Sequence, residues 1–269
     1  MHRLFNKSRV LLSVYLAYMS EYRAELFLWA LAGLLPFVMM GIWMQASAAA
    51  GDAMSMTPLD MQRYFLAVFI IRQMTVVWVI WEFEFHVVSG RLSPYLLQPL
   101  DPAWRFIAQH ICDQIIRVPF AMLLVVVFFV LYPQALWMPD PLAVLQAAVL
   151  IALAFAARFL MQYSLATGCF WFERIGGMEQ LLFMAYLFLS GLVAPLERFP
   201  EAVRTFALWT PFPYMVYVPA QLLTGIRTPG FHVSFMQGLL VMVGWVAVFF
   251  VINRWLWRRG LRNYSAMGA

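Results

Sequence analysis

The sequence predicts an all-α membrane protein of six transmembrane helices, because composition, hydropathy and the length of the apolar runs all favour it. Of the 269 residues, 64% are hydrophobic and only 12% are charged, whereas a soluble domain carries about 25% charged residues. The mean hydropathy is +0.78. So few charges cannot cover a chain of this size with a water-compatible surface. The composition therefore excludes a soluble enzyme and a nucleic-acid-binding protein.

Each predicted span is an apolar stretch close to the roughly 20 residues that cross a bilayer. In chain order, the spans are residues 26–47, 64–83, 106–131, 142–170, 178–195 and 232–256. Residues 1–25 mix basic and apolar side chains, which is typical of a helix lying in the membrane interface. The fifth span is short and is followed by Pro195. Residues 121–130 are continuously apolar rather than alternating, which excludes a transmembrane β-barrel. We expect a single transmembrane domain over residues 1–269.

A cleaved secretory signal is the alternative for the N-terminus. Residues 46–48, Ala-Ser-Ala, resemble a small-residue cleavage site after an apolar run. That run is about 20 residues long, whereas the apolar core of a signal peptide usually has about 7–15. The length favours a retained first span.

The basic residues predict the orientation, because loops rich in Lys and Arg mark the cytoplasmic side. With six spans, both termini share one side. If that side is the cytoplasm, it holds eleven of the eighteen basic residues: Arg3, Lys7, Arg9, Arg23, Arg91, Arg105, Arg174, Arg254, Arg258, Arg259 and Arg262. The outer side then holds four: Arg63, Arg198, Arg204 and Arg227. We therefore predict that both termini are cytoplasmic.

The other three arginines lie inside predicted spans. Arg117 and Arg158 are expected to extend toward the inner interface, and Asp113 is one helical turn from Arg117 and can pair with it. Arg72 is about nine residues from either end of the second span, where an arginine costs about 2.5–3.5 kcal/mol to insert. Arg72 therefore either pairs with an acid or with backbone carbonyls of another span, or faces an aqueous path.

Two connecting segments are too apolar for plain solvated loops. Residues 84–105 join the second and third spans, and residues 196–231 join the fifth and sixth. In the latter, residues 201–209 predict a short helix, residues 211–214 break it, and residues 215–223 form another apolar turn that ends at Gly225. Irregular backbone at membrane depth survives only against protein or a water-filled cavity. A pair of short re-entrant or surface-lying helices is therefore expected on the outer side.

No catalytic or cofactor-binding motif is recognisable. Lys7 is the only lysine and lacks the glycine-rich context of a P-loop, so the chain cannot bind ATP through a P-loop of its own. Cys112 and Cys169 lie in apolar stretches, and no metal-ligand spacing joins them to the scattered histidines, His2, His86, His110 and His232. Glu82 and Glu84 are two residues apart and point to different helix faces, which favours interfacial charges over an acid/base pair.

Two motifs carry a family resemblance. Residues 89–100, Ser-Gly-Arg-Leu-Ser-Pro-Tyr-Leu-Leu-Gln-Pro-Leu, resemble the cytoplasmic signature of ABC-2 type (type-2 ATP-binding-cassette) transporter permeases, in the branch whose members commonly work as two different adjacent permeases. Residues 195–225 resemble the outer re-entrant segment of that branch. The interfacial N-terminus, span count and loop order match as well, so the resemblance covers almost the whole chain. Gln98 departs from the pattern, since relatives often carry a basic residue there.

The resemblance implies the permease subunit of an ATP-driven exporter in the bacterial inner membrane. Such a subunit moves a hydrophobic or amphipathic substrate out of the cytoplasm or the inner leaflet. The chain would hold no cofactor, since ATP and Mg²⁺ would be bound by two copies of a separate P-loop ATPase. A second permease, either a copy of this chain or a related six-span chain, would complete the complex in the lipid bilayer.

The same resemblance implies roles for particular residues. A cytoplasmic coupling helix that docks into the ATPase would comprise Gly90, Arg91, Leu92, Ser93, Pro94, Tyr95 and Leu96, with the leucines and the tyrosine as apolar anchors and the arginine at the rim. Residues 1–25 would form a connecting helix near the ATPase. Spans two and five would line the translocation path, with Arg72, Met184 and Phe188 as candidate path residues. The outer segment would form the lid of that path.

Two other classes of function stay open on the residues alone. One is an intramembrane enzyme that modifies lipids, which the lack of a paired acid/base or metal set disfavours. The other is a membrane scaffold or sensor without transport. A neighbouring reading frame that encodes a P-loop ATPase, beside a second six-span permease, would decide between these classes.

Overall fold

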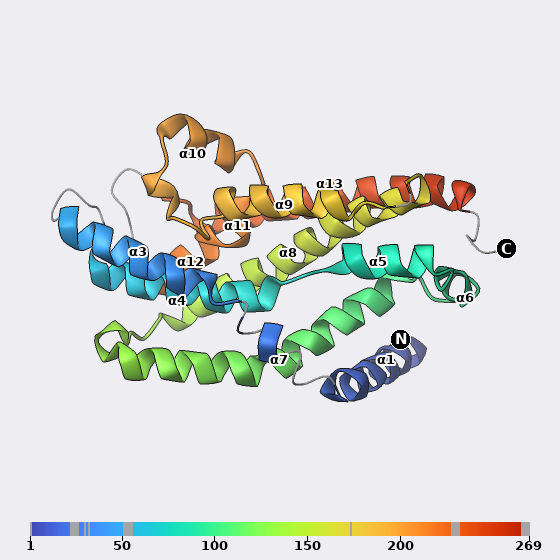
Figure 1. The fold of residues 1–269 in the computed structure, drawn as a ribbon, viewed down its shortest axis with the longest axis horizontal. Coiled ribbons are helices and arrows are strands. Elements are labelled where there is room, and N and C mark those ends of the chain that lie inside the picture. The colour runs from blue at the N-terminus through green and yellow to red at the C-terminus, as the bar shows by residue number, and fades with distance from the viewer. Residues whose placement is uncertain are drawn as a thin grey trace.

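The computed structural model describes residues 2–21, 27–29, 31, 33–50, 56–172, 174–226 and 232–264, and across these residues the chain is helical without strands. Four helical segments of the described chain are long and apolar enough to cross a membrane: Pro58–Val88, Ala103–Leu131, Pro141–Phe170 and Phe235–Asn263. They run lengthwise in one elongated bundle (Figure 1). Two shorter apolar helices, Leu35–Ala49 and Gly176–Leu189, overlap the first and fifth predicted spans. The all-α prediction is confirmed for the described residues, and the count of six spans stays a prediction.

The third, fourth and sixth predicted spans each correspond to a long helix. They are α7 (Ala103–Leu131), α8 (Pro141–Ala166), which the 3-10 turn η3 (Thr167–Phe170) continues, and α13 (Phe235–Asn263). Side-chain caps mark two of the starts. Asp140 accepts a hydrogen bond from the Leu142 N–H (3.3 Å), and Ser234 accepts one from the Gln237 N–H (3.2 Å). These caps satisfy N–H groups that have no partner inside the helix.

The second predicted span is two helices rather than one, α4 (Pro58–Thr75) and α5 (Val79–Val88). Between them the backbone of Val76 is extended. Residues 75–79 are Thr-Val-Val-Trp-Val, a run of β-branched and aromatic side chains with weak helix propensity. The Trp78 N–H donates to Nε2 of His110 on α7 at 3.1 Å. The break is therefore stabilised by a neighbouring helix, as irregular backbone at membrane depth requires.

The N-terminal segment forms α1 (His2–Glu21), which lies alongside α7 (Figure 1). Leu12, Tyr15 and Leu16 pack around the buried Cys112 of α7. Next, α3 (Leu35–Ala50) packs on α4. The start of the predicted first span at residue 26 lies outside the described residues. In the described part, the amphipathic N-terminus uses its apolar face to contact the bundle.

The fifth predicted span ends early, because α9 (Gly176–Leu189) stops before Gly191. Gly191 has φ +89°, and a Cβ there would lie 2.6 Å from the Tyr64 hydroxyl. That hydroxyl donates to the Gly191 carbonyl at 2.7 Å. Left-handed backbone and close approach both require glycine, so the helix ends where α4 meets the turn.

Four short helices follow: the 3-10 turn η4 (Leu196–Arg198), α10 (Glu201–Leu208), α11 (Phe212–Met215) and α12 (Tyr217–Thr224). The α12 helix is buried against α4 and α8, whereas Phe206 of α10 and Trp209, which follows α10, are exposed. Gly225, with φ +65°, ends α12 as the sequence predicts. Of this outer segment, α12 is therefore inserted between the long helices, whereas α10 lies on the surface.

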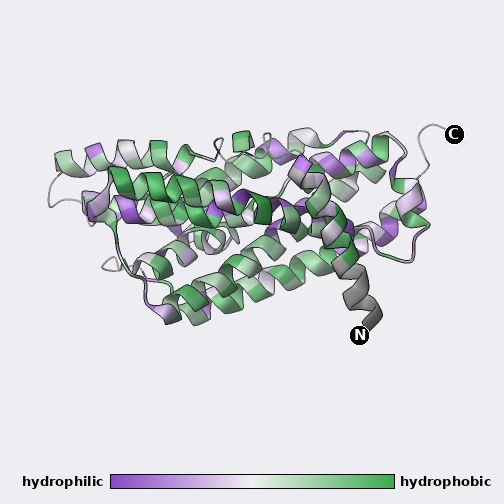
Figure 2. Cartoon of the chain, turned by 90° about the horizontal axis from the view of Figure 1, so that it is seen from below, coloured by the Kyte–Doolittle hydropathy of each residue, from purple (hydrophilic) through white to green (hydrophobic). Residues whose placement is uncertain are grey.

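Burial differs strongly between the long helices. Within their most apolar stretches, 67% of the residues are buried in Pro58–Val88, against 17% in Ala103–Leu131 and 11% in Phe235–Asn263. Hydrophobic residues extend along the full length of the long helices (Figure 2). The α4–α5 segment is therefore the centre of the bundle, and α7 and α13 present apolar faces that suit lipid or a partner chain.

Candidate functional site

The coupling-helix motif folds as a tight turn followed by a short helix, α6 (Leu92–Leu96). Gly90 ends α5 with φ +70°, and its N–H donates to the Val87 carbonyl at 3.1 Å. Glycine enters the left-handed region without the cost that other residues meet there. The Ser-Gly-Arg part of the motif is therefore a helix stop that turns the chain into α6.

Leu92 holds α6 to the bundle. Its side chain is fully buried in a cluster with Phe83, Phe106 and Trp257. The Ser93 hydroxyl hydrogen-bonds the Tyr264 hydroxyl at 3.1 Å, which ties α6 to the end of α13. Because Leu92 faces inward, the expectation that it contacts a partner as an outward anchor is wrong.

The outward side of this turn carries other residues of the motif. Arg91 and Pro94 are exposed, and Leu97, just after α6, is 88% exposed. Tyr95 is half-buried and stacks between His86 (5.3 Å between ring centroids) and the Arg105 guanidinium (4.6 Å). Within residues 90–97, the surface available to a partner is therefore formed by Arg91, Pro94 and Leu97.

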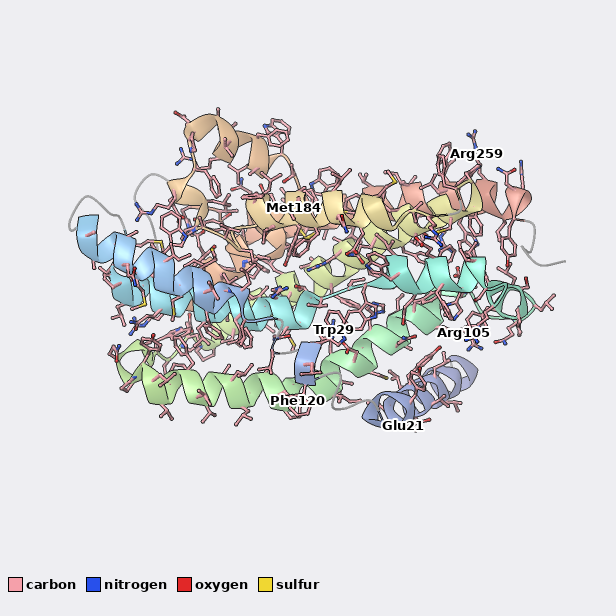
Figure 3. The ribbon with its side chains drawn as sticks, in the orientation of Figure 1. Glu21, Trp29, Arg105, Phe120, Met184 and Arg259 are labelled. Atoms are coloured by element: carbon pink, nitrogen blue, oxygen red, sulfur yellow. The ribbon has the colours of Figure 1, made fainter. Side chains whose placement is uncertain are left out.

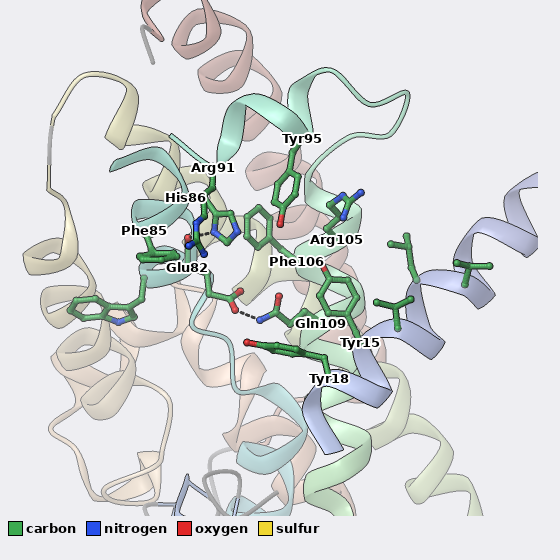
Figure 4. Close-up of a pocket in the computed structure, with 14 residues that line it drawn as sticks. Tyr15, Tyr18, Glu82, Phe85, His86, Arg91, Tyr95, Arg105, Phe106 and Gln109 are labelled. Carbon is green, nitrogen blue, oxygen red and sulfur yellow. Dashed lines mark hydrogen bonds between the residues drawn. The ribbon is translucent and has the colours of Figure 1, made fainter. Parts of the chain in front are cut away.

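A cavity of about 750 Å³ opens beside α6, between α1, α5 and α7 (Figure 4). Its polar lining includes Glu82, His86 and Gln109, and its cationic lining is Arg91 and Arg105. Sequence analysis missed this cavity because its walls come from separate segments, and no single segment carries a recognisable spacing.

A tyrosine from α1 completes the cavity wall. Burial raises the pKa of Tyr15 above its usual value of 10.0, and the neighbouring Tyr95 raises it further. The Tyr15 phenol therefore stays protonated at neutral pH and can donate a hydrogen bond.

The three intramembrane arginines lie near the middle of their helical segments. Arg117 is the central residue of α7, and Arg72 and Arg158 are close to the centres of Pro58–Val88 and Pro141–Phe170. Arg117 is 2% exposed and Arg158 is 7% exposed. The expectation that these two extend to the inner interface is wrong, because the bundle covers them at mid-depth.

One of these arginines has a carboxylate partner. Asp113 pairs with Arg117 on the same helix face, as the four-residue spacing predicts. The Arg117 guanidinium also lies over the Trp78 ring (5.0 Å), and that of Arg158 lies over the Tyr186 ring (4.2 Å). Aromatic faces stabilise a cation where water is absent.

Several arginine nitrogens stay unsatisfied. Nη1 of Arg72, Nε of Arg117 and Nη1 of Arg158 are buried without a hydrogen-bond partner, and no carboxylate among the described residues pairs with Arg72 or Arg158. Arg117 and Arg158 both repel the Arg72 charge. The acid partner expected as one option for Arg72 is therefore not found in the described chain, and the mid-depth region carries excess positive charge.

Met184 and Phe188 do not meet Arg72. They are 48% and 50% exposed on the outer face of α9, whereas Tyr186 on the same helix is buried and interacts electrostatically with Arg72. Figure 3 shows Met184 on the side of the bundle opposite Phe120 of α7. The candidate path residues thus divide into an inward arginine and an outward apolar pair.

The two glutamates of α5 contact different neighbours, as their spacing predicts. Glu84 accepts hydrogen bonds from the backbone N–H groups of Ile175 (2.9 Å) and Gly176 (3.0 Å) at the start of α9. Glu82 accepts one from Gln109 of α7. A carboxylate at a helix N-terminus satisfies unpaired N–H groups and complements the helix dipole. Glu84 therefore fixes α9 to α5.

Comparison with known protein families identifies a match that covers most of the chain. Residues 54–268 match the family described as ABC-2 family transporter protein. No curated protein and no solved structure gives a match. Within the described residues, no group of three His, Cys, Asp or Glu side chains could hold a metal ion.

Proposed function

Because the chain belongs to the ABC-2 transporter family and is a multi-pass membrane permease, we propose that it exports a hydrophobic or amphipathic substrate with ATP hydrolysed by a separate subunit. The only lysine, Lys7, has no P-loop context, so the proposal assigns ATP and Mg²⁺ to that partner. Two ATPase copies would serve a pair of permeases.

The observation that carries the coupling proposal is the way α6 is attached. Leu92 anchors it among the ends of α5, α7 and α13, and Ser93 ties it to Tyr264. A push on the exposed Arg91, Pro94 or Leu97 would therefore pass to three long helices at once. This rigid attachment suits a helix that transmits movement from an ATPase.

The distribution of charge supports a cytoplasmic location for this end of the bundle. The start of α1, the end of α13 and α6 lie at the same end (Figure 1), and the last turns of α13 add Arg254, Arg258, Arg259 and Arg262. Because basic residues gather on the cytoplasmic side, we assign α6 and both termini to the cytoplasm.

A second permease would cover the outer face of α9. Four apolar side chains are exposed there: Met178, Leu181, Met184 and Phe188. A path between two permeases would give Met184 and Phe188 access to substrate, while Arg72 would reach it from inside the bundle. The outer helices α10 to α12 would close this path as its lid.

The coupling proposal is tested by the double variant Arg91→Ala/Leu97→Ala. We expect the variant permease to insert and fold normally but to lose ATPase co-purification and transport. The variant removes an arginine, a residue type enriched in interface hot spots, and the exposed side chain of Leu97. The matched control is Met138→Ala, which removes a side chain that is 95% exposed in the loop between α7 and α8.

Co-purification of the native complex, followed by its mass, also reports the number of ATPase copies and the identity of the second permease. Normal ATPase association in the double variant would contradict the coupling role of α6. A native complex without any P-loop subunit would contradict the proposed exporter function. A membrane scaffold or an intramembrane enzyme would then be the preferred interpretation.

A further inference from the structure

The cavity beside α6 shares only Arg91 with the proposed ATPase-contact surface of Arg91, Pro94 and Leu97. Its walls are α1 on one side, α5 and α6 on another, and α7 on the third (Figure 4). Its volume of about 750 Å³ lies within the roughly 300–1,000 Å³ typical of ligand pockets. The cavity lies between α1, α5 and α7, and at its edge Trp81 donates a hydrogen bond to Glu179 of α9.

Two cations sit on the α6 side of the cavity. The Arg91 guanidinium lies 5.1 Å from the centroid of the Phe85 ring, and that of Arg105 lies 4.6 Å from the Tyr95 ring. Arg105 also donates to the side-chain oxygen of Gln98. Stacking holds each guanidinium in place and leaves donors free, which suits binding of a phosphate group.

A hydrogen-bond acceptor lies deeper in the same cavity. Oε1 of Glu82 accepts a hydrogen bond from Gln109, while its Oε2 is buried without a partner. A buried side-chain oxygen without a hydrogen-bond partner carries a desolvation cost that a ligand donor would remove. The cavity therefore offers donors at one end and an unsatisfied acceptor at the other.

The rest of the lining is apolar and open. Val10 and Val14 of α1 are 61% and 58% exposed, and Trp81 and Phe85 of α5 are 49% and 52% exposed. Exposed side chains of this kind, next to polar groups at the end of a membrane bundle, suit acyl chains beneath a headgroup.

We propose that this cavity binds a glycerophospholipid whose headgroup carries a hydrogen-bond donor beside its phosphate. The phosphate lies against Arg91 and Arg105, an amine donates to Glu82, and the acyl chains run along Val14 and Trp81. Because neither Met184 nor Phe188 lines the cavity, the lipid is a resident that joins the N-terminal helix to the coupling helix. The lipid would lie in the inner leaflet only if α6 is cytoplasmic, as proposed above. The headgroup contacts depend on the cavity residues alone and do not require that topology.

The test compares two lipids that differ only in methylation of the amine. The purified full chain is titrated with phosphatidylethanolamine or phosphatidylcholine, and bound lipid is counted by native mass spectrometry. Since a hydrogen bond to a charged group contributes strongly, phosphatidylethanolamine should bind roughly tenfold more tightly. Equal binding of the two lipids would overturn the role of Glu82.

Three variants locate the site. Arg105→Gln should weaken both lipids. Glu82→Leu, which removes both side-chain oxygens, should abolish the preference between them and leave phosphatidylcholine binding unchanged. The control is Arg259→Gln, which removes another arginine stacked on an aromatic ring, Trp255 (4.3 Å), near the same end but outside the cavity. If Arg105→Gln and Arg259→Gln have the same effect on binding, the lipid is not in this cavity.

A last arm separates a resident lipid from cargo. In the ATPase complex reconstituted into vesicles, adding ATP should leave the occupancy of phosphatidylethanolamine unchanged, and a fall in occupancy would overturn the resident assignment. The lipid titration uses the permease alone, so failure of the exporter proposal would not alter its outcome.

Discussion

Arg117 carries its charge at the centre of α7 and finds its counter-charge one turn away, at Asp113. We expect Asp113→Asn to destabilise the folded protein by about 3–5 kcal/mol, because it leaves a buried guanidinium unpaired beside two other arginines. The control is Asp101→Asn, since Asp101 and Arg254 form a pair in which both side chains are 30% exposed, worth at most about 1 kcal/mol. Thermal unfolding in detergent measures both, and equal shifts would contradict a structural role for Asp113.

Replacing Arg72, unlike replacing Asp113, is not expected to destabilise the folded protein. Its buried Nη1 lacks a partner, and no described carboxylate compensates its charge. Arg72→Gln should leave stability and assembly unchanged or improved, because it removes a charge that costs about 2.5–3.5 kcal/mol at mid-membrane. Export of an anionic amphiphile should fall at the same time, while export of a neutral one should not. Loss of thermal stability in this variant would mean that Arg72 forms a structural contact.

Single residues of the candidate site differed in how far the sequence could predict their surroundings. A four-residue spacing places Asp113 and Arg117 on one helix face whatever surrounds them, so their pairing was predictable. The direction of Arg117 and Arg158 was not, because an arginine extends to the interface only where no neighbour covers it. Leu92 was misassigned for the same reason, since its burial depends on Phe106 and Trp257, which are distant in the sequence.

Glu84 gives a prediction at the scale of elements, since it joins α5 to the start of α9. Glu84→Ala leaves two N–H groups without an acceptor and should lower the free energy of unfolding by about 1–3 kcal/mol. Glu84→Gln keeps an oxygen acceptor and loses only the charge, so it should cost about 1 kcal/mol or less. Thermal unfolding ranks the two variants. Glu201→Ala, on the exposed start of α10, is the control, and a larger effect there would contradict the joint.

Helix boundaries were predictable to different degrees. Long, mostly apolar runs placed α7, α8 and α13, because length and hydropathy alone specify a spanning helix. The break between α4 and α5 escaped the same reasoning, since residues 75–79 are as apolar as their neighbours and differ only in helix propensity. The end of α9 escaped it too, because the constraint on Gly191 comes from Tyr64 in another helix.

In the whole molecule, the most apolar helices lie on the outside of the bundle and a more polar helix lies at its centre. The long helices α7 and α13 are mostly exposed along their apolar faces, while α4 is enclosed. Composition predicted a membrane protein, and it could not tell which helix would be central, because α4 contains more polar residues than its neighbours and is still the most buried. What selects α4 is contact with α3, α8 and α12 together.

The orientation of this bundle gives the last prediction, tested by two single cysteines at the most exposed positions of opposite ends. Leu97→Cys, at a site 88% exposed after α6, should react with an impermeant maleimide only after spheroplasts are opened. Met138→Cys, at a site 95% exposed between α7 and α8, should react in intact spheroplasts. The native Cys112 and Cys169 are buried and give the low background. Basic residues near α6 and both termini favour this orientation, and the reverse labelling would place α6 out of reach of any cytoplasmic ATPase.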